Sequence, residues 1–135
     1  MSTQKVSKQP VQGDYSSLLT EANVKNYNMI FPMLESILNE MKVLSSKKQD
    51  GILNNFKVKL INRLIGPARE LLADEPTLEY LEEIEEDMLP QNSDVVLILC
   101  QYIEALEQFK RKNQVYIDGV HRWRTQENQY PSIKK

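Results

Sequence analysis

The 135-residue chain contains a single cysteine, Cys100, and a single histidine, His121. One thiol cannot form an internal disulfide, and this usage fits a reducing compartment, so we expect a cytoplasmic protein. One Cys and one His also exclude the usual multi-ligand zinc patterns. The four glycines are scattered singly, which leaves no Gly-rich loop for phosphate. We therefore expect neither a cofactor nor a metal ion.

Long apolar runs are also lacking. The longest, residues 95–100, is far shorter than the roughly 20 residues of a membrane span, so we expect no membrane partner. Residues 1–14 are polar and have no apolar core of the kind found in signal peptides. The composition predicts a disordered N-terminal tail at 1–14, a single helical domain at 15–126 and a C-terminal tail at 127–135.

Charge is abundant but segregated. The formal net charge is only −2, yet residues 70–109 carry twelve acidic side chains and no Lys or Arg. The flanking blocks, 42–69 and 110–135, carry seven basic side chains each. Such segregated blocks indicate which surfaces contact one another or a partner, rather than a catalytic function. Part of the charge can be neutralised inside the fold, where each exposed pair contributes at most about 1 kcal/mol.

Apolar residues recur at three- and four-residue steps in four segments, which predicts helices at about 21–45, 51–73, 76–89 and from 94 onward. Thr20 is a plausible N-cap of the first helix, and Pro32 predicts a kink or a new helix near Phe31. The connections are short. The pattern therefore predicts an all-α domain, an up-down antiparallel four-helix bundle.

The fourth segment is expected to be the longest helix. Its apolar stripe continues past Phe109 through Tyr116, Ile117, Val120 and Trp123, although Asp118-Gly119 can fray or break it. A helix of about thirty residues would overhang its neighbours at 1.5 Å per residue. Three things could cover the overhanging aromatic residues: the segment 15–19, a second copy of the chain, or another protein.

Two sets of charged side chains on the predicted second and third helices are candidates for a functional role. Glu79, Glu82, Glu83 and Glu86 are expected on an outward face, where a solvated surface is the first interpretation and a partner-binding face the second. A metal or catalytic site there would need inward carboxylates and histidines. Glu85 and Lys57 interrupt apolar stripes; we expect each at the rim with its charge in water, rather than as a buried pair.

Basic and aromatic residues alternate near the C-terminus, where bases suit phosphate and aromatic rings suit base stacking. Ordinary packing and a contact with another protein or a second copy are the competing interpretations. The sequence pI of about 5.5 lacks the strongly basic character of a nucleic-acid domain.

The resulting hypothesis is a non-enzymatic protein–protein interaction module, such as an adaptor, inhibitor or assembly factor. Its partner would be another protein, for instance a basic one, or a second copy in a homodimer. The alternative is a nucleic-acid-binding accessory protein; a small enzyme is disfavoured because no residue has a recognisable catalytic context. The predicted partner-binding residues are Glu79, Glu82, Glu83, Glu86, Lys110, Arg111, Tyr116, Val120, Arg122, Trp123 and Arg124.

Overall fold

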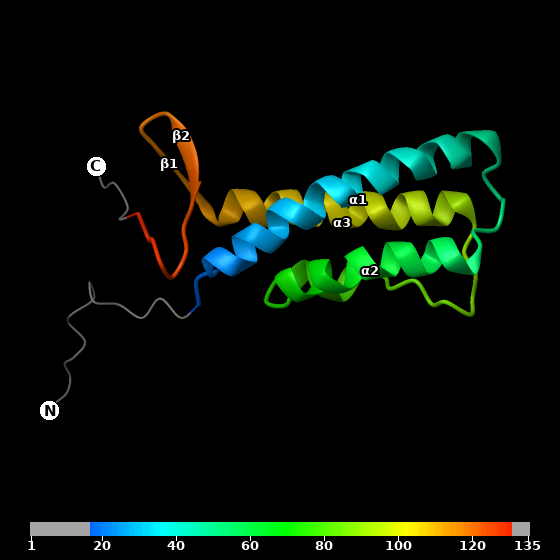
Figure 1. The fold of residues 1–135 in the computed structure, drawn as a ribbon, viewed down its shortest axis with the longest axis horizontal. Helices are drawn as coiled ribbons and strands as arrows, with labels where there is room; N and C mark the ends of the chain where they lie inside the picture. Colours follow the sequence, from blue (N-terminus) through cyan, green and yellow to red (C-terminus); the bar gives the residue numbers. More distant parts are fainter. Residues whose placement is uncertain (1–16, 131–135) are drawn as a thin grey trace, which may run out of the picture.

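The computed structural model describes residues 17–130, which form three α-helices and a β-hairpin (Figure 1). In chain order the elements are α1 Glu21–Lys47, α2 Asn55–Leu71, the short 3-10 helix η2 Pro76–Tyr80, α3 Asn92–Lys112, β1 Gln114–Ile117 and β2 Val120–Trp123. A mostly helical fold is thus confirmed, whereas the four-helix bundle is wrong. The tail expected at 1–14 lies outside the described residues. None of the helices within 17–130 is long and apolar enough to cross a membrane.

Helix α1 is the longest of the three helices and packs against both of the others. Thr20 is its N-cap, as predicted: its side chain accepts the amide of Asn23, and the side chain of Asn23 accepts the amide of Thr20. The helix continues through Pro32, so a separate helix beginning near Phe31 is wrong. An internal proline costs about 3 kcal/mol, and the long buried face of α1 offsets that cost.

Helices α2 and α3 run in the same direction, opposite to α1 (Figure 1). Their starts are joined by backbone hydrogen bonds: the amide of Leu53 donates to Pro90 O at 2.9 Å, and the amide of Asn92 donates to Gly51 O at 2.8 Å. The predicted antiparallel order therefore fails for this pair. Between the two helices the chain travels back along the bundle as a non-helical segment, residues 81–90, which we call the acidic strap.

The helix predicted at 76–89 is wrong beyond Tyr80, and its own charges supply one reason. Glu79, Glu82, Glu83 and Glu86 would stand three and four residues apart on a helix with no nearby base, so each pairing would be repulsive. Backbone carbonyl groups of the extended strap instead accept hydrogen bonds from side chains of the neighbouring helices. Ile84 is buried, whereas Met88 is exposed.

The hydrophobic core lies where α1 meets α2 and α3. Fully buried side chains come from all three helices and from the residue that follows α2; they are Leu34, Val58, Leu72, Val95, Leu99, Tyr102 and Leu106. The strap closes one side of this core through Ile84. The core therefore fixes the far end of α3, where the hairpin begins.

The hairpin replaces the second half of the predicted long helix. Asp118 has φ 54° and Gly119 φ 79°, the two positive values that a type I′ turn requires. The strands pair in register from Ile117 opposite Val120 to Gln114 opposite Trp123. The side chains of residues 114–117 and 120–123 therefore alternate between the two faces of the hairpin, whereas the helical interpretation assumed a period of 3.6.

The segment after β2 returns to the start of α1. The amide of Gln126 donates to Leu19 O at 2.7 Å, and the amide of Glu21 donates to Glu127 Oε1 at 3.0 Å. Leu19 and Thr125 form a parallel bridge. These contacts hold the two ends of the described chain together beside the hairpin.

Candidate partner-binding groove

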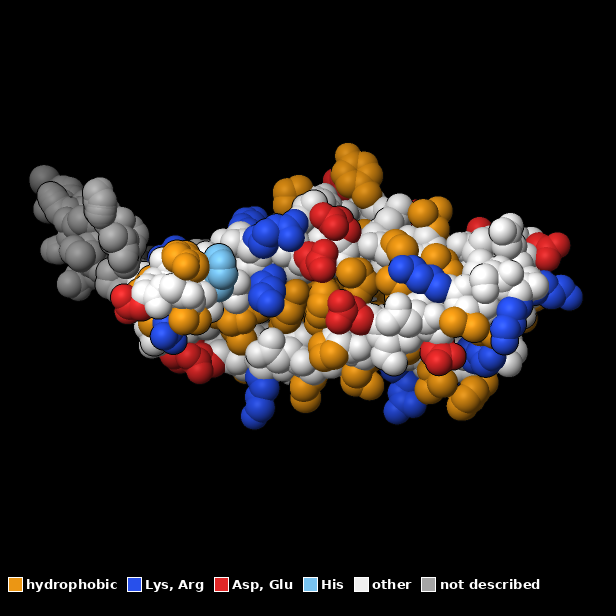
Figure 2. Space-filling model, turned by 90° about the horizontal axis from the view of Figure 1, so that it is seen from above, with side chains coloured by type: hydrophobic (Ala, Val, Ile, Leu, Met, Phe, Trp, Pro, Cys, Tyr) orange, Lys and Arg blue, Asp and Glu red, His pale blue; other side chains and the backbone are white. Residues whose placement is uncertain are grey.

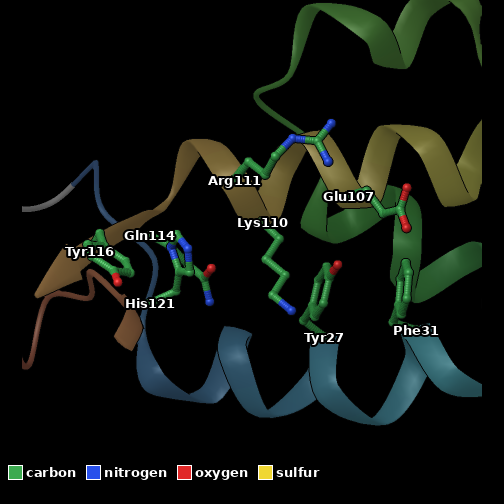
Figure 3. Close-up of a pocket in the computed structure, with 8 residues that line it drawn as sticks. All are labelled: Tyr27, Phe31, Glu107, Lys110, Arg111, Gln114, Tyr116 and His121. Atoms are coloured by element: carbon green, nitrogen blue, oxygen red, sulfur yellow. The ribbon is translucent and has the colours of Figure 1, made fainter. Parts of the chain in front are cut away.

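A groove of about 680 Å³ lies where α1, the end of α3 and the hairpin meet (Figure 3). Helix α1 contributes two aromatic rings, α3 contributes three charged side chains, and the hairpin contributes an amide, a phenol and an imidazole. The lining residues are Tyr27, Phe31, Glu107, Lys110, Arg111, Gln114, Tyr116 and His121. In Figure 3, Lys110 reaches from α3 into the space between the hairpin side chains and Tyr27.

An aromatic cluster forms the base of the groove and holds the hairpin against the bundle. The Tyr27 ring stacks on Phe31 with centroids 5.3 Å apart and meets the edge of Trp123 at 5.0 Å. Phe109 lies 6.2 Å from Tyr27 and 6.4 Å from Trp123. Trp123 is therefore covered by α1 of the same chain. What covers this residue was an open question from the sequence alone.

Tyr27 is a buried polar group within this cluster. Its hydroxyl donates to Leu106 O at 3.1 Å. Burial, with smaller contributions from the nearby Glu107 and Glu35 carboxylates, raises the pKa of Tyr27 to about 12. The phenol is consequently neutral at physiological pH and contributes a fixed hydrogen bond rather than a charge.

The raised pKa of Tyr27 predicts alkaline destabilisation. Its contribution to the free energy of unfolding is complete below pH 10, where the phenol is protonated in both states, and is lost as pH rises through about 12. Urea unfolding at a series of alkaline pH values should show the Tyr27→Phe variant losing less stability than the wild type over this window. Tyr116→Phe, at an exposed phenol, should keep the wild-type slope; equal slopes for all three proteins would contradict the assignment.

The basic side chains at the end of α3 differ in how fully they are paired. Arg111 Nη2 lies 3.7 Å from Glu104 Oε2, with both side chains exposed, and Lys112 Nζ lies 3.2 Å from Glu75 Oε1. Lys110 makes no ion pair with any residue in 17–130. The His121 ring packs against Tyr116 at 4.9 Å. Figure 2 shows the pale blue imidazole beside blue basic side chains at the hairpin end of the molecule.

Only some of the predicted basic and aromatic residues meet in the groove. Lys110, Arg111 and Tyr116 line it, and Trp123 packs beneath. Val120 and Arg122 project from the other face of the hairpin, because side chains alternate along a strand. The Arg124 amide donates to Asn113 O. Tyr116, which the helical interpretation placed on the core stripe, is instead 65% exposed, and Val120 is exposed as well.

The predicted acidic residues lie apart from the groove. Glu79 belongs to η2, whereas Glu82, Glu83 and Glu86 belong to the strap, and all four are exposed as expected. They do not form a helix face. Glu83 Oε2 lies 3.5 Å from Arg69 Nη2, so the basic second helix neutralises part of this charge.

Lys57 and Glu85 are also exposed, which confirms their expected position at the rim. Neither forms an ion pair within the described chain, so the alternative of a direct pair between them is wrong. Across residues 17–130 no group of three or more His, Cys, Asp or Glu side chains converges as a metal site would require. The acidic strap is therefore a charged surface whose carboxylates face water.

Several groove residues were missed from the sequence. Tyr27 and Phe31 looked like ordinary core residues of the first helix, and Gln114 gave no signal by itself. The signal that could have found the groove is the dipeptide Asp118-Gly119 between two short segments rich in β-branched and aromatic residues, which is a strong indicator of a hairpin. A hairpin after α3 folds Tyr116 and His121 back beside Lys110.

Comparison of the chain with protein-family models, with curated proteins and with solved structures found no match. Its function must therefore be argued from the groove itself.

Proposed function

We propose that the protein is a non-enzymatic protein–protein interaction module that binds an acidic segment of another protein in the groove. The observation that supports this best is the convergence of Lys110 and Arg111 with the exposed Tyr116 ring on one concave surface. Arginine and tyrosine are among the residues enriched at the energetic centres of interfaces. Lys110 has no acidic partner within the described chain, so a carboxylate of the partner can approach it without displacing an existing ion pair.

The local charges favour a protein segment over the two alternative partners. Glu107 lines the groove and Glu104 lies beside Arg111, so a continuous polyphosphate would meet repulsion that a segment with spaced carboxylates can avoid. A symmetric homodimer through the groove would bring two copies of Lys110 and Arg111 together. A basic partner on the acidic strap stays a prediction, and Arg69 already neutralises part of that surface.

Charge reversal in the groove tests the proposal. Peptides selected on the wild-type protein from a random phage-displayed library are expected to be enriched in Asp and Glu. Binding of the selected peptides, measured by fluorescence anisotropy, should weaken at least about tenfold in the Lys110→Glu/Arg111→Glu variant, because two favourable charge interactions become repulsive.

Lys59→Glu/Arg63→Glu is the matched control, since it makes the same charge change at exposed positions on α2. It should leave peptide affinity within about twofold, because surface charges beyond a Debye length of about 8 Å are largely screened. Circular dichroism should confirm that both variants keep their helices. Selection of basic or neutral peptides, or equal loss in the two variants, would contradict the proposal. Retention of single-stranded DNA by the wild type alone would favour the nucleic-acid alternative.

A further inference from the structure

Within the described chain the hairpin is a two-stranded sheet with no third strand. The segment that follows β2 pairs with Leu19 through Thr125, beyond the end of the two-stranded ladder. No corresponding element of residues 17–130 pairs with the outer edge of β1. Unpaired strand edges present backbone donors and acceptors that another extended chain can use.

The register shows which backbone groups face outward. In a two-residue type I′ hairpin the pair next to the turn, Ile117 and Val120, exchanges hydrogen bonds, and hydrogen-bonded pairs then alternate along the ladder. This alternation makes Asn113 and Arg124 a hydrogen-bonded pair, and the Arg124 amide does donate to Asn113 O at 2.9 Å. Gln114 and Tyr116 are therefore the residues of β1 whose amides and carbonyls point away from β2.

The two faces of the hairpin differ in chemistry. Gln114, Tyr116 and His121 face the groove, where Lys110 and Arg111 supply positive charge. Val115, Ile117 and Val120 share the opposite face with Arg122, so this face is apolar apart from one guanidinium group. Because side chains of an added strand also alternate, a matching segment would place acidic residues beside the groove and apolar residues on the other face.

We infer that the partner binds as an extended strand of alternating acidic and apolar residues, added to the outer edge of β1. This inference rests on the proposed function and specifies how the acidic segment is held. Gln114 and Tyr116 provide the backbone hydrogen bonds, Lys110 and Arg111 attract the acidic side chains, and Val115 and Ile117 extend the apolar face. The edge holds the backbone of the segment, and the groove selects its charge.

Amide hydrogen exchange measured by NMR separates strand addition from side-chain docking. The probe is a capped peptide in which Glu alternates with Val. In the free protein the amides of Gln114 and Tyr116 should exchange faster than those of Val115 and Ile117, which are paired with β2. Saturation with the peptide should slow exchange at Gln114 and Tyr116 by at least about tenfold, because these amides become donors to the added strand.

Two further comparisons isolate the backbone bonds. The Glu-Val peptide N-methylated on its edge-facing amides should bind at least about tenfold more weakly than the unmodified peptide. Tyr116→Pro and Tyr116→Ala both lack the ring, but only the proline variant also lacks the outward amide, so it should bind more weakly than the alanine variant. Proline is tolerated at such an edge position, and continued protection of the Val115 and Ile117 amides would show that the hairpin is intact.

The outcomes distinguish the inference from the proposed function. If peptides bind through Lys110 and Arg111 but Gln114 and Tyr116 gain no protection, or if N-methylation leaves affinity unchanged, strand addition is overturned while the acidic-segment function stands. The same holds if selected acidic peptides bind and the Glu-Val peptide does not. If no acidic peptide binds the wild-type protein, the proposed function fails and the inference fails with it.

Discussion

A Leu99→Ala substitution is expected to lower the free energy of unfolding by about 2–5 kcal/mol. Leu99 lies on α3 in the core and is 0% exposed. Removal of the isopropyl group beyond Cβ loses the transfer free energy of the removed atoms and leaves a cavity that the surrounding helices fill only in part. Urea denaturation followed by circular dichroism at 222 nm should measure the change as a lower midpoint with an unaltered slope.

Leu97→Ala is the matched control because it makes the same chemical change two residues earlier on the same helix. Leu97 is 61% exposed, so its loss should change stability by no more than about 0.5 kcal/mol. The two variants together test the rotational orientation of α3, which positions the groove at its end. Equal destabilisation by the two substitutions would be incompatible with the burial of Leu99 and the exposure of Leu97.

A Tyr102→Phe substitution is the second large perturbation, with an expected loss of about 1–3 kcal/mol. The Tyr102 hydroxyl donates to Glu82 O of the acidic strap at 2.8 Å and accepts from Arg69 Nη1 at 3.0 Å. The Arg69 Nη1 group also donates to Leu81 O at 3.0 Å. Phenylalanine keeps the packing of the ring but leaves both partners of the hydroxyl short of a hydrogen bond.

A double-mutant cycle with Arg69→Met would show whether the two side chains act together in holding the strap. Because they share a hydrogen bond and adjacent strap carbonyls, the combined loss should be smaller than the sum of the single losses. Tyr80→Phe, at an exposed phenol, should be neutral. Strict additivity of Tyr102→Phe and Arg69→Met would contradict the shared network.

The three α-helices were predictable because each one buries a face with a regular helical period. Thr20 marked the first start, and the apolar steps of residues 21–45 located α1 to within a few residues. The strap was not predictable in this way. The spacing of Leu78, Leu81 and Ile84 is compatible with a helix. The strap is extended partly because side chains from other parts of the chain bind its carbonyl groups, as in the 2.8 Å hydrogen bond from Asn62 Nδ2 to Ile84 O.

The hairpin was missed although its signal is local. Within ten residues the apolar positions 116, 117, 120 and 123 fit a helical stripe, whereas the hairpin places 116 and 123 on one face and 117 and 120 on the other. Only the turn residues indicate the hairpin. Asp118 and Gly119 tolerate positive φ, which a helix excludes. Among the groove residues, Lys110, Arg111 and Tyr116 could be predicted to lie together because they are close in sequence. Tyr27 and Phe31 could not, because they join the groove only through the packing of α1 against α3.

The composite origin of the groove links ligand binding to the folding equilibrium. Its walls come from the first half of α1, the last turn of α3 and the hairpin, and the bond from Gln126 to Leu19 ties these parts together. No single helix or strand contains the whole surface, so a ligand of the groove would bind the native state and not the unfolded chain. A ligand bound in the groove would therefore raise the unfolding free energy of the entire domain by mass action.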